Sequence, residues 1–108
     1  MTLIEILQGA KDELIKNGWV KGTYNVGEKH CIIGAVATVQ NLGSYYSAEG
    51  SPAVELLTQL CGINAWGVHG GNVAFWQDMD GRTFADVMDL FDRAILEAKE
   101  REAQHASK

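Results

Sequence analysis

Apolar residues recur every three or four positions along the first 17 residues, which is typical of one buried helix face. Thr2 followed by Glu5 forms a capping box at the start of this pattern. Gly18 ends the pattern and opens an irregular connection over 18–29. We therefore predict a helix over 3–17, whose buried stripe consists of Leu3, Leu7, Ala10 and Leu14, widened by Ile4, Ile6 and Ile15.

Residues 31–42 are apolar almost all round, and their β-branched members would also suit a buried strand. The length of the run and the lack of a convincing second strand favour a central buried helix. Small residues at 34–38 would let a neighbouring element approach its backbone closely. Gly9, inside the first predicted helix, likewise indicates a close neighbour, because glycine there costs about 1 kcal/mol relative to alanine.

Two further helices have clear start signals. Ser51 is a typical N-cap residue, and the only proline, Pro52, follows at the first helical position. Thr83 and Asp86 form a similar cap before a long amphipathic helix, whose predicted buried stripe runs from Phe84 to Ala98. The polar tail beyond Arg101 is expected to fray. The two predicted helices span 52–61 and 84–101.

Residues 62–82 break the helical pattern and carry five glycines beside Trp66 and Trp76. Within this segment, residues 73–76 could form a short strand or a helical turn. A segment of this length without regular structure is usually functional when it occurs in a compact domain. The whole pattern predicts an all-α fold for residues 1–108: one small four-helix domain with a long Gly- and aromatic-rich irregular segment.

Composition agrees with a single globular domain that can bury its own core: 108 residues, 46% hydrophobic and 21% charged. Nine Lys and Arg against 14 Asp and Glu give a net charge of −5, so direct nucleic-acid binding is not expected. No apolar run is long enough to span a membrane, and the signal-peptide layout is missing. We expect a cytoplasmic protein that does not act on a membrane.

The two cysteines, Cys31 and Cys61, stand next to apolar residues, which is typical of reduced and buried thiols. Alternatively, Cys31 could lie in a first helical turn that lowers its pKa, with His30 or His69 as the base. No local signature supports this nucleophile, so no catalytic residue is assigned. The alternative is a small-molecule-binding or thiol-dependent enzyme domain, with a pocket near Cys31 that is also lined by His69, Asp78 and Arg82.

No cofactor and no metal site are predicted. The histidines and cysteines lack the spacing of zinc ligands. Asp78 and Asp80 resemble the start of a calcium loop, but its other ligands are missing, and we expect both to shape the turn before Thr83. The glycines of residues 67–71 do not match a phosphate-binding loop.

The irregular segment contains the candidate binding site, because it mixes aromatic and charged residues as binding hot spots do. This interpretation requires indoles that project outward. The alternative is that the rings close the open end of the core, with an arginine stacked on a tryptophan. The candidate binding residues are Trp66, His69, Trp76, Asp78, Asp80 and Arg82.

Several motifs in this order resemble a family of small uncharacterised domains from actinobacteria and their phages. They are Gly18–Trp19, the Cys-x-x-Gly-Ala motif at 31–35, the Trp-x-Asp-x-x-Gly-Arg-Thr motif at 76–83, and Asp92-Arg93-Ala94. Position 77 departs from the pattern, with Gln77 where asparagine is expected. The resemblance implies accessory biology of a bacterium or phage, and it implies nothing about catalysis.

These observations favour a small non-enzymatic accessory protein, encoded by a phage, that binds a host or phage macromolecule, with a protein as the expected partner. The acidic net charge would steer the chain toward basic surfaces. A further alternative is a structural homo-oligomer, in which the small residues at 34–38 pack between subunits.

Overall fold

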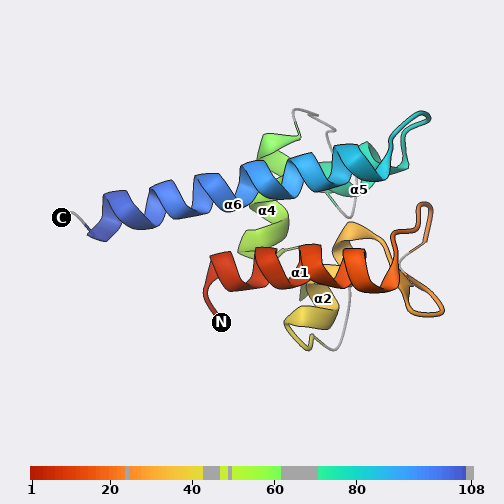
Figure 1. Cartoon of the computed structure of the whole chain (residues 1–108), viewed down its shortest axis with the longest axis horizontal. Coiled ribbons are helices and arrows are strands. Elements are labelled where there is room, and N and C mark those ends of the chain that lie inside the picture. Colours follow the sequence, from red (N-terminus) through yellow and green to blue (C-terminus); the bar gives the residue numbers. More distant parts are fainter. Residues whose placement is uncertain (24, 43–46, 49, 62–70, 107–108) are drawn as a thin grey trace.

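The computed structural model describes residues 1–23, 25–42, 47–48, 50–61 and 71–106. These residues form five labelled helices and one short hairpin, with labels as in Figure 1. The elements are α1 (Leu3–Asn17), β1 (Asn25–Val26), β2 (Lys29–His30), α2 (Ile32–Val39), α4 (Pro52–Leu60), α5 (Gly71–Asp78) and α6 (Phe84–Ala106). The chain is therefore mostly helical, as predicted.

Helix α5 corrects the prediction that residues 62–82 are irregular throughout. It settles the choice left open for residues 73–76 in favour of helix. Its buried side chains, Val73, Trp76 and Gln77, lie where α5 packs against α2 and α4. A helix this short gains most of its stability from such tertiary contacts, which a search for periodic stripes does not detect.

A two-stranded antiparallel hairpin lies in the connection predicted to be irregular. Asn25 pairs with His30 and Val26 with Lys29, and Trp19 forms an isolated bridge with His30. Each strand has only two residues, so alternation along the sequence could not reveal it. The hairpin corrects the irregular connection predicted over 18–29, while the described residues remain mostly helical.

The predicted caps are confirmed. Thr2 Oγ1 accepts a hydrogen bond from Glu5 N (3.1 Å), and Glu5 Oε1 accepts one from Thr2 N (2.9 Å). The side chain of Ser51 caps α4, and Pro52 is its first residue. Before α6, Thr83 Oγ1 accepts from Asp86 N (3.2 Å) while Asp86 Oδ2 accepts from Thr83 N (2.9 Å). Helix α6, however, continues to Ala106, so the predicted end of this helix at 101 is wrong.

Close packing of α1 on α2 explains Gly9. A Cβ atom at this position would lie 2.9 Å from Val39 Cγ1, a distance that such atoms essentially never show. The close neighbour that Gly9 predicted is therefore confirmed, and it is α2.

The largest fully buried side chains of the core are Phe91, Leu7, Leu14, Ile32, Ile33, Leu56, Leu57, Leu90, Gln77, Val36, Val54 and Val73.

Figure 1 shows α1 and α6 running in opposite directions across one side of the molecule, with α2, α4 and α5 behind them. The end of α1 and the start of α6 lie at the same end of the molecule as the hairpin, while the C-terminal turns of α6 extend past the start of α1. No helix within the described ranges combines the length and hydrophobicity needed to cross a membrane.

Candidate functional site

Trp76 is buried, which contradicts the expectation of an outward-facing indole. Only 5% of the residue is exposed, and it belongs to the core cluster. The guanidinium carbon of Arg82 lies 4.0 Å from the centroid of its ring, and Arg82 Nε donates a hydrogen bond to Trp76 O (3.1 Å). Trp76 and Arg82 thus form the structural stack that was the alternative interpretation. Trp66 and His69 lie outside the described residues.

The turn after α5 holds the first loop of the chain in place. Asp78 Oδ1 accepts a hydrogen bond from Gly22 N (2.9 Å), and Lys21 Nζ donates to Met79 O (2.9 Å). Asp78 therefore accepts from the amide of a distant residue, which corrects the expectation that it bonds the amides of its own turn. Asp80 lies on the surface beside it.

Gln77 connects three elements at the end of the core, a role that the sequence pattern did not indicate. It is 2% exposed, and its Oε1 accepts hydrogen bonds from Ile32 N (2.9 Å) and from Trp19 Nε1 (3.2 Å). It thereby joins α5 to the first turn of α2 and to the loop after α1. Because this buried amide oxygen accepts from both donors, Gln77 fixes the orientation of the Trp19 indole.

Cys31 is the N-cap of α2, and its Sγ accepts a hydrogen bond from Gly34 N (3.3 Å). Burial raises the pKa of the Cys31 thiol, although hydrogen bonds from Gly34 and Gln77 oppose the rise. The lowered pKa expected from a helix start is therefore wrong, because desolvation outweighs the donors at this position. A neutral buried thiol is a poor nucleophile.

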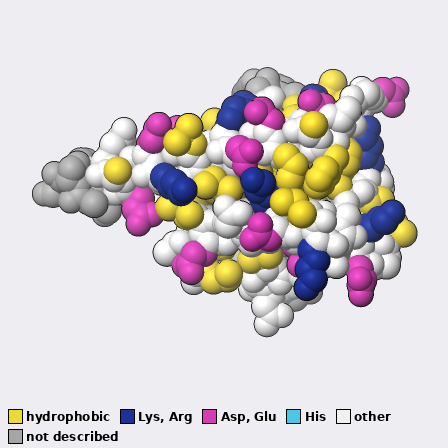
Figure 2. Space-filling model, viewed as in Figure 1, with side chains coloured by type: hydrophobic (Ala, Val, Ile, Leu, Met, Phe, Trp, Pro, Cys, Tyr) yellow, Lys and Arg dark blue, Asp and Glu magenta, His cyan; other side chains and the backbone are white. Residues whose placement is uncertain are grey.

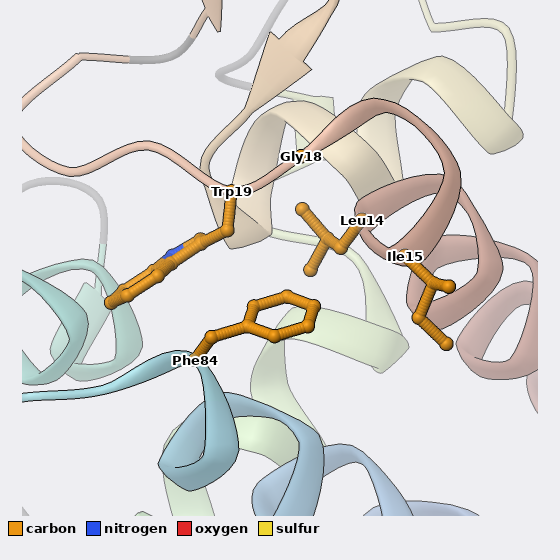
Figure 3. Close-up of a pocket in the computed structure, with 5 residues that line it drawn as sticks. All are labelled: Leu14, Ile15, Gly18, Trp19 and Phe84. Carbon is orange, nitrogen blue, oxygen red and sulfur yellow. The ribbon is translucent and has the colours of Figure 1, made fainter.

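A surface pocket of about 230 Å³ lies where the end of α1 meets the start of α6. Figure 3 shows Leu14 and Phe84 pointing toward one another there, with Trp19 on one side and Ile15 on the other. The ring centroids of Trp19 and Phe84 are 6.4 Å apart, so the two rings form one apolar wall. The lining residues are Leu14, Ile15, Gly18, Trp19 and Phe84.

Two of the pocket residues expose much of their apolar side chains. Ile15 is 58% exposed and Phe84 is 38% exposed, whereas Leu14 at the base is fully buried. On the face shown in Figure 2, a yellow patch lies between α1 and the start of α6. Both exposed residues had been placed on buried stripes. Ile15 follows Leu14, about 100° away around the helix, and this offset was the available sign of its exposure.

Three lysines lie next to residues of the pocket wall, in the chain or in space. Lys16 follows Ile15 in the last turn of α1. Lys21 Nζ lies 5.7 Å from the centroid of the Trp19 ring. The Lys29 side chain packs against Gly18, with its Cγ 3.0 Å from where a Cβ of residue 18 would be. Lys16 and Lys29 form no ion pair within the described ranges. We call these three residues the lysine rim.

Several carboxylates at this end of the molecule accept hydrogen bonds, whereas Glu28 and Asp80 are exposed. Glu13 Oε1 lies 3.1 Å from His30 Nε2 and accepts from Asn17 Nδ2 (2.6 Å). Asp78 accepts from Gly22, and Asp86 caps α6. Hydrogen bonds from neutral amides leave Asp78 and Asp86 charged, so both signs of charge are present at this end of the molecule. In the part of the chain that the structure describes, no cluster of three or more potential ligands is placed to hold a metal ion.

The fold and the site define a small helical domain with an apolar pocket at one end and a structural stack behind it. The chain belongs to the family of unknown function DUF6197, whose family model matches residues 1–97. No curated protein and no solved structure matches the chain significantly.

Proposed function

We propose that this chain is a small non-enzymatic accessory protein that binds a protein partner through the pocket of Ile15, Trp19 and Phe84. The observation that carries the proposal is the exposure of this apolar pocket above the fully buried Leu14. Exposed apolar patches bordered by charged residues are characteristic of protein interaction sites. Leu14 and Gln77 support the pocket from the core, so it needs no rearrangement before binding.

The pocket volume supports a protein partner over a free metabolite. Cofactor and drug-sized sites typically measure about 300–1,000 Å³, which exceeds this pocket. A cavity of about 150 Å³ already holds a benzene molecule. A pocket of about 230 Å³ therefore suits one large apolar side chain. The burial of Cys31 gives no support to the alternative of a thiol-dependent enzyme.

The organism that encodes this protein and the organism that supplies its partner are both proposed from the family resemblance alone. The Trp76–Thr83 and Asp92–Ala94 motifs favour a phage-encoded protein of actinobacteria that acts in the host cytoplasm. The partner would accordingly be a protein of that host or of the phage.

Affinity capture from an actinobacterial lysate, prepared with and without phage infection, tests this proposal. The baits are the full chain, an Ile15→Glu variant and a matched Leu96→Glu variant. Leu96 is exposed to the same extent, 58%, but does not line the pocket. We expect a partner that the wild type and Leu96→Glu retain and that Ile15→Glu loses. A set of captured proteins that is identical for all three baits would contradict the proposal.

A further inference from the structure

We infer that Asn17 and Gly18 form a self-modification site, at which Asn17 loses its side-chain amide when the last turn of α1 opens. Asparagine followed by glycine undergoes this reaction faster than other asparagine pairs, because glycine has no side chain to hinder attack by its own backbone nitrogen. The pair occurs once in the chain. The inference is independent of the proposed function, since it concerns only bonds within this protein.

The reaction consumes nothing but water. The backbone nitrogen of Gly18 gives its proton to hydroxide and attacks Cγ of Asn17, and the new C–N bond closes a five-membered succinimide ring. The bond between Cγ and Nδ2 breaks, and the nitrogen takes a proton from water and leaves as ammonia. Water then opens the ring and leaves aspartate or isoaspartate at position 17. Because both groups belong to one chain, their closeness in sequence drives the attack.

The structure holds both reacting groups in hydrogen bonds. Gly18 N, the attacking nitrogen, donates to Leu14 O (3.0 Å) and so completes the last turn of α1. Asn17 Nδ2, the leaving nitrogen, donates to Glu13 Oε1 (2.6 Å). An intact last turn therefore protects the site, because the nucleophile is engaged as a helix donor. Local opening of the helix end, which does not require global unfolding, is the step that releases it.

Contacts from the hairpin keep this turn closed. His30 Nε2 lies 3.1 Å from the same Glu13 oxygen, and His30 N donates to Gly18 O (3.1 Å). The Lys29 side chain packs against Gly18. Gly18 itself has a φ of +102°, which a residue with a side chain rarely adopts. The fold thus favours glycine at the position where a larger side chain would slow the reaction.

Loss of the amide would weaken the end of α1. An aspartate at position 17 would place a carboxylate where the amide now donates to Glu13, and like charges four residues apart on a helix repel. The new charge would also lie at the C-terminal end of the helix, where the dipole disfavours anions. Gly18 and Trp19, which line the pocket, follow this turn directly (Figure 3), so the modification would disturb the pocket wall.

Peptide mass spectrometry of the full chain tests the inference after prolonged incubation at mildly alkaline pH, in buffer and in concentrated urea. We expect Asn17 to be modified in urea and at least ~10-fold more slowly in the native protein. Asn41 is the internal reference: it is exposed but precedes Leu42, so it should react slowly in both samples. Equal rates at Asn17 in buffer and in urea would overturn the inference, and so would no modification of Asn17 in urea.

Removal of the Asn17 acceptor tests the protection. Glu13→Ala should raise the native rate several-fold and leave the rate in urea unchanged, because only the folded state contains this hydrogen bond. Asp12→Ala is the matched control: Asp12 is the preceding residue of α1, but it accepts from Gln8 and should affect neither rate. A native rate in Glu13→Ala equal to that of the wild type would show that this contact does not protect the site.

The Asn17→Asp variant reproduces one product and tests the consequence. We expect its melting temperature to fall by about 4–8 °C, and Glu13→Gln in the same chain to restore part of the loss. Asn41→Asp is the control, since it also adds a carboxylate just after a helix, but the Asn41 side chain has no hydrogen bond within the described residues. Equal losses for the two variants would contradict repulsion from Glu13.

Discussion

The carboxamide oxygen of Gln77 lies 3.2 Å from the indole nitrogen of Trp19, although the two residues are 58 positions apart in the chain. The same oxygen accepts a second hydrogen bond, from Ile32 N at 2.9 Å. Trp19 lines the pocket and Gln77 is in the core, so this bond links the proposed binding surface to the interior. The pocket wall is therefore positioned by a buried polar contact as well as by packing.

Replacing Gln77 by leucine should destabilise the protein by about 1–3 kcal/mol, because the Ile32 amide is left buried without its acceptor. The free energy of unfolding from urea titration measures this change. Gln59→Leu is the control: Gln59 lies on the surface of α4, and its loss should change stability by no more than about 0.5 kcal/mol. If the two substitutions change the free energy of unfolding equally, the hydrogen bonds of Gln77 do not hold the three elements together.

Gly9→Ala should destabilise the protein by about 1 kcal/mol, since the overpacking against Val39 exceeds the gain in helix propensity. The cost should shrink in a Val39→Ala background, which removes the atoms that the new methyl group would meet. Thermal or urea unfolding of the single and double variants measures the coupling. Gly50→Ala serves as the control, because no atom lies within 4 Å of a Cβ there. Additive effects at positions 9 and 39 would contradict the close contact.

Cys31 should react with a thiol reagent at about pH 8 only as the protein unfolds, whereas the half-buried Cys61 should react more readily. The reaction is followed by absorbance in the single variants Cys31→Ser and Cys61→Ser, with and without denaturant. If the Cys61→Ser variant is labelled equally fast when native and when unfolded, Cys31 is accessible and the structural assignment fails.

The same thiol makes stability depend on alkaline pH. Burial raises the pKa of Cys31 above its ordinary value of 9.0, so folding disfavours the thiolate. The stabilisation that the protonated thiol gives the folded state is complete below pH 9.0. It is lost as pH rises above this value toward the folded-state pKa. The stability of the wild type relative to Cys31→Ala should therefore decrease above about pH 9. If the stability difference between the wild type and Cys31→Ala stays constant above about pH 9, the pKa of Cys31 is not raised by folding.

Asp86 should make stability depend on acidic pH in the opposite direction. The hydrogen bond from the Thr83 amide lowers the pKa of Asp86 below 3.8. The ionised carboxylate therefore stabilises the folded state above that value, and this stabilisation is lost as pH falls. The melting temperature of the wild type should exceed that of Asp86→Asn near neutral pH, and the difference should narrow as pH falls below about 4. If the difference in melting temperature grows as pH falls, the ionised Asp86 carboxylate does not cap α6.

The starts of the helices at residues 3, 52 and 84 could be predicted because their signals are local. Thr2 and Glu5, Ser51 and Pro52, and Thr83 and Asp86 each act within one helical turn, and the structure shows each cap as expected. The pairs of Asp89 with Arg93 and of Glu97 with Arg101 likewise follow from the helical repeat.

The candidate site was harder to predict, because its residues come from distant parts of the chain. Trp76 looked like an exposed anchor, but α5 turns its ring into the core under Arg82. Ile15 and Phe84 looked buried, but they lie where α1 ends and α6 begins, at the edge of the contact between these helices. Periodicity identifies the face of a helix that packs, but not how far along the helix the packing continues.

The sequence by itself determined that this protein is mostly helical, where most of its helices begin, and that Gly9 has a close neighbour. These features depend on backbone capping and on the spacing of apolar residues, which act over a few positions. Only the tertiary structure decided that residues 71–78 are helical, that Gln77 holds Trp19, and that an apolar pocket opens beside a lysine rim. Those features depend on contacts between segments far apart in the chain, and their stability comes from packing that no single segment possesses.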